Sequence, residues 1–118
     1  MTKVLIVDDS KLIHKITKNV LVNREVEIES AFNGNEAIEV FKSFKPDLVL
    51  LDIVMPEKDG IETLKDLLII NPDVRAIMVS SMGTKDKVAE ALQLGAIDFL
   101  QKPFDEEALL SHFDKLEG

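Results

Sequence analysis

The chain has 118 residues, and its 46% hydrophobic content is enough for one domain with a substantial core. Its formal net charge of -8 and the lack of a basic run argue against nucleic acid or an anionic membrane as a direct partner. The sequence has no cysteine, no signal-peptide pattern and no apolar run near the ~20 residues of a membrane span. We therefore expect a soluble cytoplasmic protein whose metal ligands, if any, are oxygen or imidazole.

The first strand is predicted at residues 3–7 and ends at two acidic residues, Asp8 and Asp9. Ser10 is a suitable N-cap for a helix, and lysines mark its polar side. The apolar residues that we place on its buried side are Leu12, Ile13, Ile16, Val20 and Leu21. His14 on this helix and His112 near the C-terminus lack metal-ligand spacing, so we interpret both as surface residues.

Residues 26–30 alternate apolar and acidic side chains, which is typical of an edge strand with one face partly in water. The chain then breaks at residues 33–35. A helix is predicted over residues 36–44, where Pro46 prevents its continuation. The third strand, residues 47–51, is almost continuously apolar, which indicates a parallel strand covered on both faces.

Asp52 follows the third strand, and a Met-Pro turn comes directly after it. A helix with an apolar stripe begins after Gly60 and ends at Asn71–Pro72. The fourth strand, residues 75–79, leads to Ser80. A helix capped at Gly95 follows.

The fifth strand is predicted at residues 97–101, and Lys102 and Pro103 make the next turn. Acidic residues then mark the start of a fifth helix, where negative charge complements the helix N-terminus. A strand-helix unit repeated five times predicts an α/β sandwich with a parallel sheet. We find no linker or repeat, and assign residues 1–118 to one domain.

Polar residues follow four strands: Asp8 and Asp9, Asp52, Ser80 and Lys102. They are expected at one edge of the sheet. Three clustered carboxylates need a cation or a shared proton, and an oxygen-only ligand set favours Mg²⁺. A carboxylate can attack phosphorus, while an ammonium and a hydroxyl stabilise the phosphoryl oxygens. This chemistry predicts that Asp52 accepts a phosphoryl group.

The segments V-D-D-S, L-D-I-V-M-P-E-K-D-G, V-S-S-M-G and Q-K-P-F resemble the receiver domain of two-component response regulators, especially the stand-alone chemotaxis type. The resemblance covers essentially the whole chain. It implies a flavodoxin-like sandwich with strand order 2-1-3-4-5. It also implies a switch that is phosphorylated by a histidine kinase, with no catalytic activity beyond its own phosphotransfer and dephosphorylation.

Matched to that pattern, Asp52 is the phosphoacceptor, and Asp8, Asp9 and the Val54 carbonyl complete the Mg²⁺ ligands. Lys102 binds phosphate, and its bond to Pro103 is expected to be cis. Gly60 is expected to serve backbone geometry.

Ser80 and Phe99 match the switch residues of the family, through which the face of the fourth helix, fifth strand and fifth helix changes its affinity for a downstream protein. We expect a monomer before phosphorylation. The chain departs from the commonest pattern at three places: Phe99 replaces a frequent tyrosine, Ser81 replaces a frequent alanine, and Val54 and Met82 are apolar. The last pair predicts slow loss of the phosphoryl group, because apolar neighbours hinder the hydrolytic water.

Several alternatives remain open. Taken singly, the acidic and hydroxyl residues could be helix caps or turn residues. An Mg²⁺-dependent aspartyl phosphatase usually carries a second acid two residues after its nucleophile, where this chain has Val54. A flavin carrier would want a glycine-rich loop and flanking aromatic residues. A phosphorylation-independent module would typically lack the acceptor or the lysine. A receiver domain excised from a larger regulator or hybrid kinase also fits the sequence.

Overall fold

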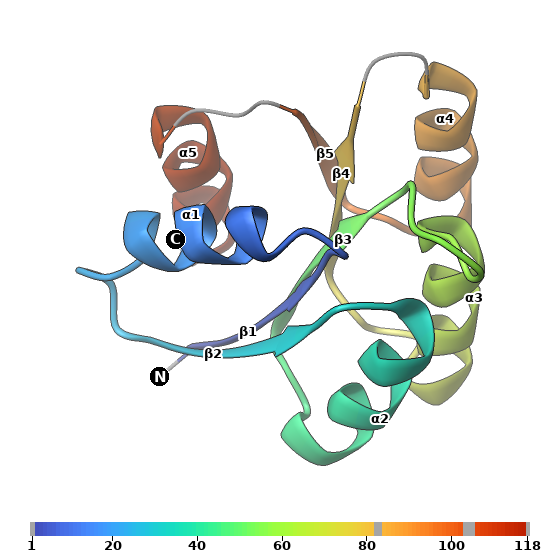
Figure 1. Cartoon of the computed structure of the whole chain (residues 1–118), viewed down its shortest axis with the longest axis horizontal. Helices are drawn as coiled ribbons and strands as arrows, with labels where there is room; N and C mark the ends of the chain where they lie inside the picture. Colours follow the sequence, from blue (N-terminus) through green and yellow to red (C-terminus); the bar gives the residue numbers. More distant parts are fainter. Residues whose placement is uncertain (1, 82–83, 103–105, 118) are drawn as a thin grey trace.

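The computed structural model describes residues 2–81, 84–102 and 106–117, and in these ranges five strands alternate with five helices (Figure 1). The strands are β1 (Thr2–Val7), β2 (Val26–Ala31), β3 (Leu48–Asp52), β4 (Ala76–Ser80) and β5 (Asp98–Gln101). The helices are α1 (Lys11–Val20), α2 (Gly34–Phe44), α3 (Gly60–Ile70), α4 (Lys85–Leu94) and α5 (Glu106–Glu117). All strands pair in parallel in the order β2-β1-β3-β4-β5, which confirms the predicted fold.

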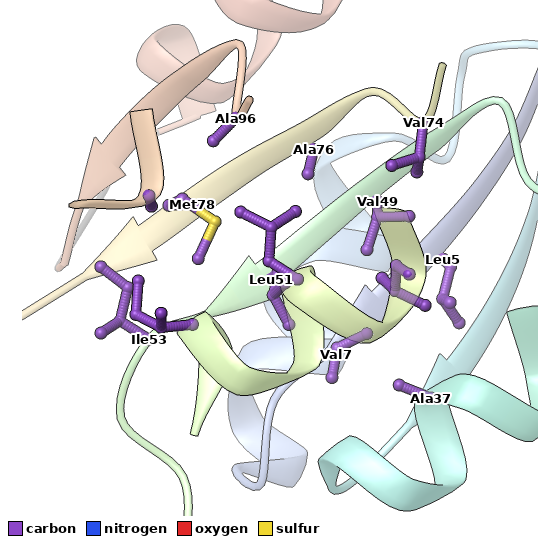
Figure 2. Close-up of a cluster of buried hydrophobic side chains, with 14 of the residues drawn as sticks. Leu5, Val7, Ala37, Val49, Leu51, Ile53, Val74, Ala76, Met78 and Ala96 are labelled. Atoms are coloured by element: carbon purple, nitrogen blue, oxygen red, sulfur yellow. The ribbon is translucent and has the colours of Figure 1, made fainter. Parts of the chain in front are cut away.

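Helices cover both faces of the sheet, with α1 and α5 on one side and α2, α3 and α4 on the other (Figure 1). Successive side chains of a strand point to opposite faces, so each inner strand contributes to two cores. In β1, Leu5 and Val7 belong to the core under α2, α3 and α4, whereas Val4 and Ile6 belong to the core under α1 and α5. Figure 2 shows the first of these cores. This double burial explains why the inner strands are apolar at nearly every position.

Side-chain caps set where three helices begin. Ser10, Asn33 and Asp59 each accept a hydrogen bond from the backbone N–H three residues later, in the usual manner of N-caps. The predicted break at residues 33–35 is therefore the start of α2, which begins two residues earlier than expected. At the other end of α2, Lys45 adopts the left-handed conformation with a φ of 51°.

The buried side of α1 differs from the prediction. Leu12 is 63% exposed and Ile16 is 37% exposed, whereas His14 is only 3% exposed. His14, Thr17 and Leu21 form the buried side, because hydrogen bonds satisfy the two polar side chains. The interpretation of His14 as a surface residue was wrong.

His112 on α5 is only partly exposed and pairs with Asp98 of β5, with 3.1 Å between Nε2 and the carboxylate. Its other ring nitrogen, Nδ1, lies 2.9 Å from the Ala108 carbonyl of the same helix. Within the described residues, no helix is long and apolar enough to cross a membrane.

Candidate functional site

The carboxyl ends of three strands bring acidic and basic side chains together. Asp52 is the last residue of β3, Asp8 follows β1, and Lys102 follows β5. The Lys102 ammonium lies 2.7 Å from Asp8 Oδ2 and 3.2 Å from Asp52 Oδ2. Both carboxylates are nearly inaccessible to solvent, at 2% and 3% exposure. The expectation that these residues meet at one edge of the sheet is confirmed.

Asp9 joins this group from the exposed side. One carboxylate oxygen from each of Asp8, Asp9 and Asp52 lies within 4.8 Å of the other two. Three carboxylates at this spacing suit a divalent cation that prefers oxygen ligands and retains some of its water, as Mg²⁺ does. The chemistry of this donor set therefore fits Mg²⁺.

The charge balance at Asp52 supports the same conclusion. Burial and the nearby charge of Asp8 raise the pKa of Asp52 from 3.8 to about 6, although Lys102 and a backbone hydrogen bond from Val54 oppose this shift. One lysine thus compensates the buried carboxylates only in part. A cation at this position would favour the ionised form of Asp52.

Against the effect of burial, the pKa of Lys102 is raised by its two carboxylate neighbours. Desolvation by itself disfavours its ammonium, but the hydrogen bond to Asp8 and the charges of Asp52 and Asp8 outweigh desolvation and raise the pKa of Lys102. Lys102 is therefore a permanent positive charge beside Asp52 at neutral pH.

Asp8 is held through four of its atoms. Its N–H donates to the Ala31 carbonyl at 3.1 Å, its Oδ1 accepts from the Ser10 N–H at 2.8 Å, and its Oδ2 faces Lys102. The fourth contact is from His14, whose Nε2 lies 2.7 Å from the Asp8 carbonyl oxygen. Sequence reasoning missed His14. The available signal was its spacing of three residues from Thr17 of α1 and seven residues from Leu21, the C-cap of α1, both of which are buried.

The two switch candidates occupy different environments. Ser80 at the end of β4 is 4% exposed, and its hydroxyl donates to the Leu100 carbonyl at 3.4 Å, toward β5. Phe99 on β5, an edge strand, is 42% exposed. Pro103 and Met82 lie outside the described residues.

Gly60 allows α3 to start directly behind Asp52. Its N–H donates to the Ile53 carbonyl at 2.7 Å, and a Cβ at this position would lie 2.2 Å from the Asp52 carbonyl oxygen. Any larger residue would therefore displace the backbone of Asp52 or the helix. Val54, two residues after Asp52, has a 55% exposed side chain, and its carbonyl remains a predicted ligand.

A family model of the response regulator receiver domain matches residues 4–114. The chain belongs to this family. Among curated proteins, it is 42% identical to the chemotaxis protein CheY of Bacillus subtilis over 114 residues, which are 96% of this chain and 95% of that protein. It is 38% identical to CheY of Thermotoga maritima, over 97% of this chain and 96% of that protein. This receiver is therefore CheY-like, and it belongs to the response regulators of two-component signalling.

Solved structures of receiver domains have the same fold as this chain. CheY in the CheX-CheY-BeF3-Mg²⁺ complex from Borrelia burgdorferi superposes with a TM-score of 0.92 and 32% identity, over 99% of this chain and 90% of that one. CheY4 of Vibrio cholerae gives a TM-score of 0.91 and 30% identity, over 98% of each chain. CheY-like receivers are signalling switches and not enzymes in the ordinary sense.

Proposed function

We propose that this receiver accepts a phosphoryl group on Asp52 from a histidine kinase, in a reaction that requires Mg²⁺. The observation that carries the proposal is the position of the Asp52 carboxylate at the end of a buried strand, 3.2 Å from the Lys102 ammonium and beside two further carboxylates. An acid placed in this way is both a nucleophile and part of a cation site.

In the transfer, a carboxylate oxygen of Asp52 forms a bond to phosphorus while the phosphorus–nitrogen bond of the donor phosphohistidine breaks. The electron pair of that bond remains on the leaving imidazole, and Asp52 becomes an acyl phosphate. The Lys102 ammonium lies close enough to Asp52 to neutralise one phosphoryl oxygen. Asp52 must be ionised to react, and its pKa of about 6 leaves most of it ionised at neutral pH.

The metal would be held by Asp8, Asp9, Asp52 and the Val54 carbonyl. When bound, Mg²⁺ supplies positive charge that offsets the charge of the transferred group. The three-carboxylate cluster supports this assignment, and so does the neighbour from Borrelia burgdorferi, a complex that contains Mg²⁺ and BeF3.

Phosphorylation would then reach a protein partner through Ser80 and Phe99. Among the described residues, the Ser80 hydroxyl makes only a long hydrogen bond to Leu100, so little free energy opposes its rotation toward the phosphate. The side chain of Phe99 on β5 would change its position after Ser80 moves. The face formed by α4, β5 and α5 then changes its affinity for a downstream protein. The CheY relatives support a role in chemotaxis. We expect the unphosphorylated chain to act as a monomer in the cytoplasm.

Intact-mass measurement after incubation with Mg²⁺ and a small phosphodonor such as acetyl phosphate tests the proposal. We expect a gain of one phosphate that disappears in Asp52→Asn and that EDTA prevents. Ser81→Ala, which removes the hydroxyl of the exposed residue after Ser80, should retain the gain. A wild-type chain that gains no phosphate, or a gain that survives Asp52→Asn, would contradict the proposal. Turnover of phosphate esters would favour the phosphatase alternative instead.

A further inference from the structure

We propose that His14 is a positioning residue for the acidic cluster, because it fixes the peptide between Asp8 and Asp9 so that both carboxylates face one cation. This inference rests on the metal site proposed above. It assigns a role to a buried histidine of α1 that the phosphotransfer chemistry does not use.

The surroundings of His14 define one arrangement of its ring. The side chain is 3% exposed, Nε2 lies 2.7 Å from the Asp8 carbonyl oxygen, and Nδ1 lies 3.0 Å from the Ser30 hydroxyl of β2. A carbonyl can only accept, so Nε2 carries the proton, and the Ser30 hydroxyl can donate to Nδ1. The Phe32 ring packs against the imidazole with 4.3 Å between centroids. Both ring nitrogens are thereby hydrogen-bonded.

The contact with the Asp8 carbonyl matters because a peptide unit is planar. The Asp8 carbonyl and the Asp9 N–H belong to the same plane, so a donor that fixes the carbonyl also fixes the direction in which Asp9 leaves β1. The Asp9 side chain is exposed and has no hydrogen bond or ion pair to any described residue. Its position therefore depends on the backbone that carries it.

Packing by itself does not require a histidine at this position. An apolar side chain could fill the space, but it would leave the buried Asp8 carbonyl without the donor that now orients it. Residues behind the ligands of a metal commonly tune affinity in this way, and their removal typically weakens binding by about 10- to 100-fold.

The test compares Mg²⁺ affinity, measured by calorimetric titration, among His14→Leu, His14→Gln and Thr17→Val. His14→Leu should weaken binding about 10- to 100-fold. His14→Gln should retain most of the affinity, because its amide can still donate to Asp8. Thr17 is 1% exposed on the same side of α1, and its hydroxyl donates to the Ile13 carbonyl of the same helix. Thr17→Val should therefore lower stability without changing affinity.

Thermal unfolding without metal reports the structural cost of each variant. Unchanged affinity in His14→Leu, equal weakening in His14→Gln, or equal weakening in Thr17→Val would overturn the proposal. If His14→Leu does not fold, Ser30→Ala replaces it in the test. Ser30→Ala should weaken Mg²⁺ binding, because the His14 ring then loses a partner that orients it. Unchanged affinity in Ser30→Ala would overturn the proposal. Long-range ¹H–¹⁵N spectra should show His14 protonated at Nε2. A wild-type chain that binds no Mg²⁺ would overturn the metal site itself, which is a separate result.

Discussion

At the scale of single residues, Asp52 is buried, which disfavours its ionised form, yet its proposed reaction requires that form. Burial at the end of β3 and the charge of Asp8 make ionisation costly, while the phosphoryl transfer that we propose needs the ionised form. Lys102 compensates part of that cost. The remaining imbalance raises the pKa of Asp52 to about 6, and it is the reason that a cation should bind here.

This imbalance gives a pH-dependent effect on stability. Between pH 3.8 and about 6, the folded chain binds more protons at Asp52 than the unfolded chain, so this residue lowers the free energy of unfolding as the pH rises. Asp52→Asn should therefore be more stable than the wild type at pH 7 without metal, by about 3 kcal/mol at most. The difference should shrink as the pH falls from 7 to 4. Urea denaturation across this range measures it.

The control for this experiment is Asp9→Asn, which removes an exposed carboxylate of the same cluster. Its effect on stability should be much smaller because water already solvates Asp9. A stability difference between Asp52→Asn and wild type that stays constant from pH 4 to 7 would contradict the expectation.

Val54 should affect how long the phosphoryl group persists. Its side chain is 55% exposed and lies two residues after Asp52, where we expect an apolar group to hinder the hydrolytic water. Val54→Asn should shorten the phosphorylated lifetime severalfold, as followed by intact mass after removal of the donor. Val22→Asn, which changes a 71% exposed valine beyond the end of α1, is the matched control and should leave the lifetime unchanged. An unaltered lifetime in Val54→Asn would count against this role.

The helices illustrate how local chemistry and packing share control of an element. N-caps at Ser10, Asn33 and Asp59 set where α1, α2 and α3 begin. At the C-terminus of α2, Lys45 adopts a left-handed conformation that costs a residue with a Cβ about 1 kcal/mol. Pro46 follows at once and prevents further helix.

Replacing Lys45 by glycine should remove that strain. We expect Lys45→Gly to raise the free energy of unfolding by about 0.5–1 kcal/mol in urea denaturation. Lys42→Gly, three residues earlier inside α2, should instead lower it by about 1 kcal/mol, because glycine is unfavourable within a helix. Destabilisation by both substitutions would show that the Lys45 side chain contributes more than its backbone strain costs.

At the scale of the molecule, the two cores make the sheet a rigid support for the acidic cluster. Side chains of β1, β3 and β4 are buried on both faces, and the polar residues Asp8, Asp52 and Ser80 lie at the carboxyl ends of these strands. Ligand binding at that edge should therefore stabilise the whole fold through linkage.

Mg²⁺ provides the test at this scale. At a free concentration tenfold above its dissociation constant, Mg²⁺ should raise the free energy of unfolding by about 1.4 kcal/mol, which thermal unfolding measures. Asp9→Asn should lose most of this increase while it retains the stability of the metal-free chain. An equal response to Mg²⁺ in both proteins would place the cation elsewhere.

The sequence by itself determined the strand-helix alternation, the boundaries of the strands to within one residue, and the meeting of Asp8, Asp52 and Lys102. Two strong signals account for this: apolar runs mark strands buried on both faces, and parallel strands necessarily place their carboxyl ends at one edge. The strand order came from the resemblance to receiver domains, because helical crossovers by themselves allow more than one order.

Only the tertiary structure decided which side of α1 is buried. Periodicity counts apolar residues, so it placed Leu12 and Ile16 inside and His14 outside. A histidine can be buried when both ring nitrogens find partners, and the partners of His14 are Asp8 and Ser30, which belong to different segments. The tertiary structure also decided the shifted pKa of Asp52 and the long hydrogen bond of Ser80. Each depends on distances between residues far apart in the chain, and no local pattern contains that information.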